Sequence, residues 1–189
     1  MSARRGRLLA ITAVAAIGLT ACFGPGSYPT SGAGAIPPGL YHLFDAADHC
    51  RWTTRDANGN LTAWSNGGGE TGFPSYAQVQ STGDTLAIDG CWFRLADSVW
   101  DKKFPPDANG DIGQGMFRVG VEVPPGTYQA DGPGVCSWAR VSSFTRQNGW
   151  LKDIVQEGVS DGGPATVTIA PTDFGFVSWV GCAKWKRIG

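Results

Sequence analysis

The stretch Val123-Pro-Pro-Gly-Thr-Tyr128, followed by Cys136-Ser-Trp138, decides the fold of this chain because most of it occurs twice. The earlier copy reads Ile36-Pro-Pro-Gly-Leu-Tyr41, followed by Cys50-Arg-Trp52. The first proline stands 13 positions before the cysteine in the earlier copy and 12 positions before it in the later one. Matches at separated points in one order predict an internal duplication.

The ends of the two copies also match. Each copy closes on a glycine and a cysteine, Gly90-Cys91 in the first and Gly181-Cys182 in the second. Just before these, Thr85-Leu-Ala-Ile88 matches Thr166-Val-Thr-Ile169. We therefore expect two tandem modules of one kind.

Short β-strands dominate the pattern within the copies. Residues Met116 to Val123 alternate large apolar side chains with polar or small ones, and a second strand, Thr127 to Ala130, follows the Pro-Pro-Gly turn. Glycine makes up 28 of 189 residues, about twice its usual share, which favours turns over long helices. Helix is expected only as a turn or two between Leu40 and His49. The fold class predicted is all-β, two tandem disulfide-stapled β modules, sandwich- or barrel-like.

The domain boundaries follow from the copies. We expect module 1 over residues 36–97 and module 2 over 115–189. The stretch between them, 98–114, lacks sustained periodicity and is expected to be a linker.

Residues 1–21 have the composition of a secretory signal peptide. Three arginines precede an apolar run of 12 residues, Leu8 to Leu19, which is too short to cross a bilayer as a helix. The run ends in Leu19-Thr20-Ala21-Cys22, which resembles the lipobox of bacterial lipoprotein precursors. That resemblance implies a diacylglycerol on Cys22, palmitate among its acyl chains, and cleavage before it. An ordinary signal peptide in which Cys22 happens to follow Ala21 is the alternative.

Residues 22–35 are rich in Gly, Pro and Ser and contain little that could build a core. This composition predicts a flexible, lipidated tether between the membrane and module 1.

Four cysteines remain beside Cys22, an even number in an exported and therefore oxidising setting, so two disulfides are expected. Four cysteines allow three pairings. The duplication selects Cys50 with Cys91 and Cys136 with Cys182, since each copy then closes its own bridge. No pair has the C-x-x-C spacing of zinc sites.

Charge and titratable residues exclude several functions. Three of the 15 basic residues lie in the first seven positions, which leaves 12 basic against 16 acidic residues and no clustered positive field for nucleic acid. His42, Asp45 and His49 would share one face of a helix and form a weak metal candidate. Asp56-Ala-Asn-Gly-Asn60 and Asp107-Ala-Asn-Gly-Asp111 resemble the start of calcium loops, but turn chemistry explains them equally. We expect no metal and no cofactor.

Catalytic motifs are scarce. There is no S-x-x-K, and the three glutamates stand in no telling context. Eight tryptophans are many for this length, and most are expected to fill thin cores. Trp64 and Trp100 lie outside clean strand patterns and are the candidate ligand surface.

In its Pro-Pro-Gly-Thr-Tyr, Cys-Ser-Trp-Ala-Arg and Gly-Pro-Ala-Thr-Val-Thr-Ile segments, the second copy resembles uncharacterised modules of secreted and lipid-anchored actinobacterial proteins. The resemblance implies exported, disulfide-bonded β structure and no particular reaction. We expect a lipoprotein on the outer face of the cell membrane, with a binding or structural role toward cell-wall glycan or an envelope protein. A hydrolase acting on envelope glycan or lipid is the alternative.

Overall fold

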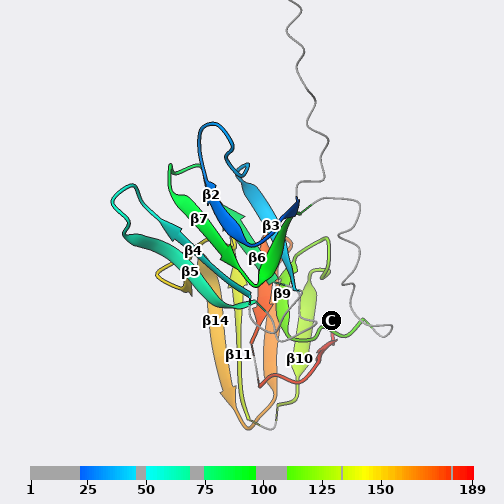
Figure 1. Ribbon diagram of the computed structural model, residues 1–189. Helices are drawn as coiled ribbons and strands as arrows, with labels where there is room; N and C mark the ends of the chain where they lie inside the picture. Colours follow the sequence, from blue (N-terminus) through cyan, green and yellow to red (C-terminus); the bar gives the residue numbers. More distant parts are fainter. Residues whose placement is uncertain (1–21, 46–49, 69–74, 97–109, 133, 180) are drawn as a thin grey trace, which may run out of the picture.

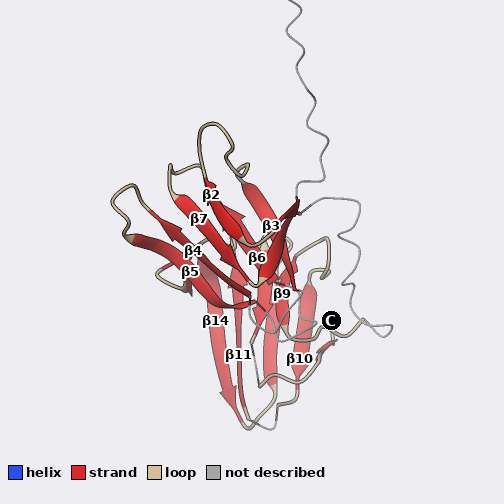
Figure 2. Ribbon diagram, in the orientation of Figure 1, coloured by secondary structure: helices blue, strands red, loops and turns tan. Residues whose placement is uncertain are grey.

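The computed structural model describes residues 22–45, 50–68, 75–96, 110–132, 134–179 and 181–189. These residues form strands, turns and loops, as Figure 2 shows, and the all-β prediction is confirmed. No helix in this part of the chain is long and apolar enough to cross a membrane.

The N-terminal half forms two four-stranded sheets. Their strands are β1 (Cys22–Phe23), β2 (Gly26–Pro29), β3 (Gly39–Asp45), β4 (Cys50–Arg55), β5 (Leu61–Gly68), β6 (Ser75–Val79), β7 (Thr85–Asp89) and β8 (Cys91–Leu95). One sheet has the order β1-β8-β3-β6 and the other β2-β7-β4-β5. Apolar side chains of both sheets, including Tyr41, Trp52 and Phe93, meet in one core. We call this unit the N-terminal sandwich.

The C-terminal half repeats this construction. Its strands are β9 (Gly115–Arg118), β10 (Gly126–Ala130), β11 (Val135–Val141), β12 (Arg146–Gln147), β13 (Trp150–Leu151), β14 (Ile154–Asp161), β15 (Ala165–Ile169), β16 (Gly175–Ser178) and β17 (Trp185–Arg187). Sheets of order β15-β10-β17 and β14-β11-β16-β9 enclose a second core around Tyr128, Trp138 and Trp185. We call this unit the C-terminal sandwich. Figure 1 shows it below the N-terminal one.

The two sandwiches share one strand order. The order β2-β7-β4-β5 corresponds to β9-β16-β11-β14, and β8-β3-β6 corresponds to β17-β10-β15. The sequence match of Thr85–Ile88 with Thr166–Ile169 is therefore wrong as a structural match, because β15 holds the place of β6 rather than that of β7. Alternation of buried and exposed residues is common to any half-buried strand, so four such residues do not identify one strand.

The segment 22–35 is not the flexible tether that its composition predicts. β1 pairs with β8 and β2 pairs with β7, both antiparallel. The rings of Phe23 and Tyr28 lie 5.3 Å apart and pack against the N-terminal core. Two aromatic side chains remove enough apolar surface from water to hold this glycine-rich stretch on the sheets.

The last part of the predicted linker, around Ile112, belongs to the C-terminal sandwich. Ile112 is fully buried and forms a bridge with Trp185 in the C-terminal sandwich. Phe23 makes the corresponding pair with Phe93 in the N-terminal sandwich. Residues 97–109, which include most of the predicted linker, lie outside the described residues.

The Pro-Pro-Gly segments cross from one sheet to the other. The strand before the second copy ends at Arg118 rather than Val123, and β9 and β10 lie in different sheets. In both copies a buried tyrosine hydroxyl donates to the carbonyl of the first proline, Tyr41 to Pro37 at 2.8 Å and Tyr128 to Pro124 at 2.7 Å. Burial raises the pKa of Tyr41 to about 12. The bond satisfies a polar atom that would otherwise be costly inside a core.

The short helix expected between Leu40 and His49 does not form where the structure describes this segment. Residues Gly39–Asp45 are strand β3, held on both sides by β6 and β8. Pairing with a strand on each side satisfies backbone groups along β3, which outweighs the weak local helix pattern. Residues 46–49 lie outside the described residues.

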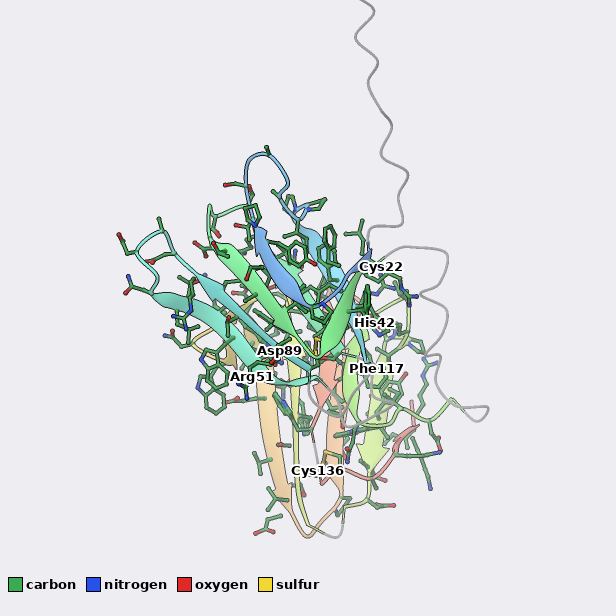
Figure 3. All side chains as sticks on the ribbon, in the orientation of Figure 1. Cys22, His42, Arg51, Asp89, Phe117 and Cys136 are labelled. Atoms are coloured by element: carbon green, nitrogen blue, oxygen red, sulfur yellow. A yellow bond between two sulfur atoms is a disulfide. The ribbon has the colours of Figure 1, made fainter. Side chains whose placement is uncertain are left out.

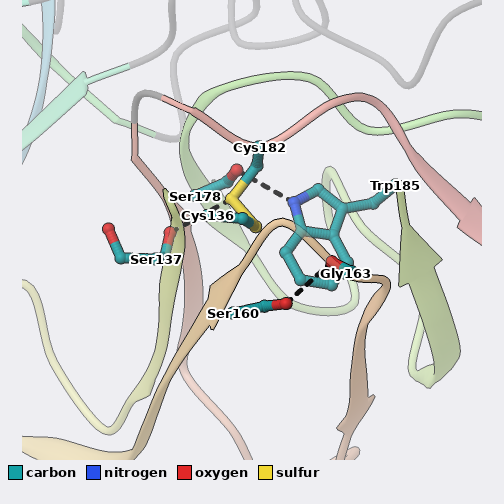
Figure 4. Close-up of a disulfide and its surroundings, with 7 residues drawn as sticks. All are labelled: Cys136, Ser137, Ser160, Gly163, Ser178, Cys182 and Trp185. Carbon is teal, nitrogen blue, oxygen red and sulfur yellow. Dashed lines mark hydrogen bonds between the residues drawn. A yellow bond between two sulfur atoms is a disulfide. The ribbon is translucent and has the colours of Figure 1, made fainter. Parts of the chain in front are cut away.

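Two disulfides close the sandwiches, Cys50 to Cys91 and Cys136 to Cys182. These are the pairs expected from the positions of the cysteines in the two copies. Trp52 and Trp138, two residues after the first cysteine of each pair, are buried in the same cores as the bridges. Figure 4 shows the second bridge beside Trp185, whose indole donates to Ser178 Oγ at 2.9 Å.

The sandwiches pack on each other through a third core. Its buried members come from both halves of the chain: Tyr76, Ala96, Met116, Ala139, Val141, Phe144, Leu151 and Val177. The ring of Tyr76 stacks on Phe144, with centroids 5.2 Å apart and planes 8° apart. The Tyr76 hydroxyl donates to Glu122 Oε1 at 2.5 Å, and Glu122 Oε2 accepts the Arg118 backbone N–H at 2.7 Å. A buried carboxylate is stable only with donors of this kind.

We predict that peptide mapping of the unreduced protein finds Cys50 linked to Cys91 and Cys136 linked to Cys182. Replacing Cys136 and Cys182 together by Ala should lower the free energy of unfolding by about 2–5 kcal/mol in denaturant titrations. Cys22→Ala is the control and should leave stability unchanged, since Cys22 is unbonded and exposed. A link between Cys50 and Cys136 would contradict the separate closure of each sandwich.

We predict that Tyr76→Phe lowers the free energy of unfolding by about 1.5–3 kcal/mol, because it removes a hydrogen bond to a charged acceptor. Tyr128→Phe is the matched control, since it removes a bond to a neutral carbonyl and should cost about 0.5–1.5 kcal/mol. Urea titration of both variants measures the difference. Equal losses would show that the Tyr76–Glu122 bond adds nothing special between the sandwiches.

Candidate functional site

A cavity of about 340 Å³ opens at one side of the N-terminal sandwich. Its walls come from β4, β5, β6 and β7, so it lies where the edge strands of the two sheets, β5 and β6, face each other. The volume is at the lower end of the range for ligand pockets, roughly 300–1,000 Å³. The cavity therefore fits one small molecule or one unit of a larger one.

The C-terminal sandwich supplies the remaining wall. Between β11 and β14 the chain forms a hairpin from β12 and β13, and Thr145, Arg146, Gln147 and Lys152 of this segment line the cavity. The corresponding connection in the N-terminal sandwich, between β4 and β5, is five residues long, whereas this one runs over twelve residues, 142–153. The longer connection lets one sandwich reach the open side of the other.

Local sequence builds the hairpin. Asn148 and Gly149 both have positive φ, 51° and 83°, as a two-residue type I′ turn requires. Arg146 pairs with Leu151 and Gln147 with Trp150 on either side of this turn. Asn-Gly is the residue pair that this turn type favours.

Contacts with the N-terminal sandwich hold the hairpin in place. Phe144, just before β12, stacks on Tyr76 of β6. A side chain added at Gly149 would lie 2.5 Å from the Trp64 ring, so only glycine lets the turn rest on this indole. Trp64 is half-buried there.

The inner part of the cavity is apolar. Trp52 and Phe93 form its aromatic surface, and their rings meet edge to face with centroids 6.3 Å apart. Leu86 and Val79, both core residues, complete this part. The indole Nε1 of Trp52 is buried and has no hydrogen-bond partner among the described residues. Such a donor normally has one, so it is available to a ligand atom or a water molecule.

Hydroxyl groups and one carboxylate form a polar side. The Thr62 hydroxyl donates to Asp84 Oδ2 at 2.9 Å. Thr62 and Thr54 hydroxyls are 2.8 Å apart, and because the Thr62 proton is already used, Thr54 donates to Thr62. The chain of bonds thus runs toward Asp84, which keeps acceptor capacity on its other oxygen. Gln78 and Gln80 add amide groups beside it.

Arg146 provides the positive charge of the site. Its Nη1 donates to the Gly149 carbonyl at 3.0 Å and its Nη2 contacts Met116 Sδ at 3.9 Å. Burial lowers the pKa of Arg146 because its charged form loses contact with water. No carboxylate of the described residues bonds to it.

The described lining offers hydrogen-bond donors, acceptors and an aromatic surface. The described residues of the lining include one carboxylate, Asp84, and no histidine, cysteine or serine. Donors, acceptors and an aromatic surface converge on one space, which suits a ligand with several hydroxyl groups.

The structure separates the residues that the sequence singled out. Trp64 supports the hairpin beside the cavity instead of offering an open platform. Trp100 and His49 lie outside the described residues. His42 is a buried strand residue whose ring lies 5.1 Å from that of Tyr76. Within the described ranges, no three His, Cys, Asp or Glu side chains gather as a metal site needs.

The Asp56 turn has a local explanation. Asp56 Oδ1 accepts the backbone N–H groups of Asn58 and Asn60, at 2.9 and 2.8 Å. The Asn60 side-chain amide donates to Asp56 Oδ2. This hydrogen bond first, and the backbone hydrogen bonds after it, lower the pKa of the Asp56 carboxyl. The carboxylate therefore serves the turn, as turn chemistry predicts.

Cys22 lies at the edge of the N-terminal sandwich, in β1 and opposite Arg94 of β8 (Figure 3). Its thiol is exposed and unbonded. It is far from the cavity in the strand order, since β1 and β6 are the two edges of the same sheet.

Sequence reasoning missed the cavity residues Trp52, Asp84 and Arg146. The one available signal was the length of the connection between Val141 and Ile154, which exceeds its counterpart and contains a complete Asn-Gly hairpin. A connection that is longer in one of two similar units is a candidate functional loop.

Comparison with known proteins now places the chain in a family. The family described as the Rv1352-like extracellular domain matches residues 109–186, a range that corresponds to the C-terminal sandwich and includes the hairpin. The uncharacterized protein Rv1352 of Mycobacterium tuberculosis and the uncharacterized protein Mb1387 of Mycobacterium bovis are each 33% identical to the chain over 90 residues, which covers 40% of this chain and 69% of each relative. No solved structure matches.

The family description agrees with the export predicted from residues 1–21 and indicates a location outside the cytoplasm. It assigns no activity. Through its C-terminal sandwich, the chain belongs to the family of the Rv1352-like extracellular domain.

Proposed function

We propose that this chain is an extracytoplasmic binding protein that takes one sugar unit of envelope glycan into the cavity between the two sandwiches. The observation that carries this proposal is the cavity itself, whose aromatic inner surface ends at the unpaired donor of Trp52 and faces the hydroxyl chain of Thr54, Thr62 and Asp84.

A sugar ring matches both sides of the cavity. Its C–H faces suit the aromatic surface of Trp52 and Phe93, and its hydroxyl groups suit the Asp84 carboxylate and the neighbouring amides. Hydroxyl groups can both donate and accept, so they satisfy donors such as Trp52 Nε1 and acceptors such as Asp84 together.

Binding is a better account than hydrolysis. Glycoside hydrolysis uses two carboxyl groups on either side of the scissile bond. The described lining holds Asp84 alone, and Thr62 already bonds to one of its oxygens. The alternative of an envelope hydrolase therefore has no second carboxylate to support it among these residues.

We also propose that Cys22 carries the lipid anchor and holds the protein on the outer face of the cell membrane. The lipobox-like Leu19-Thr20-Ala21-Cys22, the exposed thiol and the extracellular family support this. The anchor would attach directly to β1 of the folded N-terminal sandwich, without a tether between them.

We further propose that the two sandwiches are copies of one ancestral module. Their common strand order and the two matching disulfides support this. The copies would begin earlier than the Pro-Pro-Gly segments, since Phe23-Gly-Pro-Gly-Ser-Tyr28 corresponds to Ile112-Gly-Gln-Gly-Met-Phe117 in both sequence spacing and pairing.

We predict that Ala63→Phe abolishes binding, because Ala63 lines the cavity on β5 and a phenyl ring there would occupy it. Residues 22–189 carrying Cys22→Ser would be incubated with cell-wall fragments and assayed for retention. Ala87→Phe is the matched control, since Ala87 lies on β7 between the core-facing Leu86 and Ile88 and does not line the cavity. Retention of the parent and Ala87→Phe proteins, with at least tenfold loss in Ala63→Phe, is expected. Release of sugars from the fragments would instead favour the hydrolase.

We predict that Cys22→Ser moves the protein from the membrane fraction to the soluble exported fraction. Two acyl chains hold a protein on a bilayer, whereas an unmodified cysteine adds nothing comparable. Palmitate labelling and the mass of the mature N-terminal peptide measure the modification in the unsubstituted protein. A mature N-terminal peptide with an unmodified Cys22 would refute the anchor and leave the cavity proposal untouched.

A further inference from the structure

We propose that the cavity selects an anionic sugar, one that carries a carboxylate or a phosphate, and that the Arg146 guanidinium recognises its charge. This inference rests on the proposed binding of a sugar and names the class of that sugar.

Arg146 has no carboxylate partner among the residues that the structure describes. Its hydrogen-bond partners are the Gly149 carbonyl and Met116 Sδ, both neutral, and its Nε is buried without any partner among the described residues. Removing a guanidinium from water is costly unless an anion or several acceptors replace the water. Burial also lowers the pKa of Arg146, which is the mark of a cation whose surroundings do not compensate its charge.

Two other arginines of this protein, Arg140 and Arg118, have carboxylates beside them. Arg140 binds Asp173 through two nitrogens, at 2.6 and 2.9 Å, and the bond raises the pKa of Arg140. Arg118 Nε lies 3.8 Å from Glu122 Oε2. Among the described residues, Arg146 therefore differs from these two by lining a cavity and lacking an acid.

The hairpin contributes a second cation. Lys152, one residue after β13, lines the same cavity and is exposed. Both positive side chains come from the C-terminal sandwich, whereas Asp84 and its threonine hydroxyls come from the N-terminal one. A sugar acid would match this division, with its anionic group toward the hairpin and its hydroxyl groups toward Asp84.

Guanidinium chemistry fits carboxylate and phosphate equally well. Its planar fork of donors binds two oxygens of either group in parallel, and such charge-assisted bonds are stronger than neutral ones. The shared property is therefore the anionic oxygen pair, and experiment must separate its two sources.

The test measures binding to matched probes by calorimetry, with residues 22–189 carrying Cys22→Ser. Glucose is compared with glucuronate and glucose 6-phosphate, and galactose with galacturonate. We expect the anionic member of at least one set to bind at least tenfold more tightly than its neutral counterpart. Preference for the uronates identifies a carboxylate ligand, and preference for the phosphate ester identifies a phosphorylated one.

Variants assign the preference to Arg146. Arg146→Gln should remove the tenfold preference by weakening the binding of the anionic sugar far more than that of its neutral counterpart, while Arg146→Lys should keep part of the preference. Arg55→Gln is the matched control, because Arg55 also donates to a glycine carbonyl of its own hairpin, Gly59 at 2.8 Å, but is exposed and does not line the cavity. Lys152→Gln, at an exposed position, should weaken the preference without affecting folding.

The outcomes separate this inference from the proposed function. Equal binding of neutral and anionic sugars, blocked by Ala63→Phe, would overturn the anion preference and keep the sugar site. An anion preference unchanged in both Arg146→Gln and Lys152→Gln would overturn the role given to the hairpin cations. Inorganic phosphate that binds the parent but not Arg146→Gln, with no sugar bound at all, would overturn the sugar and leave a small-anion site. Absence of binding to every probe would overturn both.

Discussion

The packed interface between the sandwiches, in which the Tyr76 hydroxyl bonds to the buried Glu122 carboxylate, is the constraint on which the cavity depends. Each sandwich has a core and a disulfide of its own, so neither needs the other to close. The cavity does need both, because its outer wall is a hairpin of the C-terminal sandwich laid over the N-terminal one. Stacking of Phe144 on Tyr76 brings that hairpin to the cavity from the same interface.

The two sandwiches share one strand order but differ in how the edge strand covers the buried tryptophan. In the C-terminal sandwich Trp138 pairs with Gly158 of the edge strand, where an added Cβ would lie 2.4 Å from the indole, so that strand covers the ring closely. In the N-terminal sandwich the corresponding Trp52 pairs with Ser65 and borders the cavity. The tryptophan opposite a glycine is covered closely by the edge strand, whereas the tryptophan opposite a serine borders a cavity. The proposed binding site would thus lie at a local departure from a shared strand order.

Features whose motifs occur in both halves of the sequence could be predicted from it. Features that depend on a single segment or contact could not. The β-class and the disulfide pairs follow from motifs present in both copies. The strands at Cys22–Phe23 and Gly26–Pro29 were hidden, because glycine and proline dominate their composition while two aromatics supply their stability. The cavity could not be predicted, since it arises from the spacing of β5 and β6 and from a contact between residues 76 and 144. Trp64 was predicted as part of a ligand surface, whereas in the structure its indole lies against the hairpin turn at Gly149.

The pairing of Phe23 with Phe93 bears on the order of events during maturation. An enzyme that cuts between Ala21 and Cys22 needs the chain around that bond extended in its own active site, which a strand already paired to β8 does not offer. If the proposed processing occurs, the peptidase and the acyltransferase must therefore act before β1 docks. The first strand of the exported protein would then join its sheet only after processing.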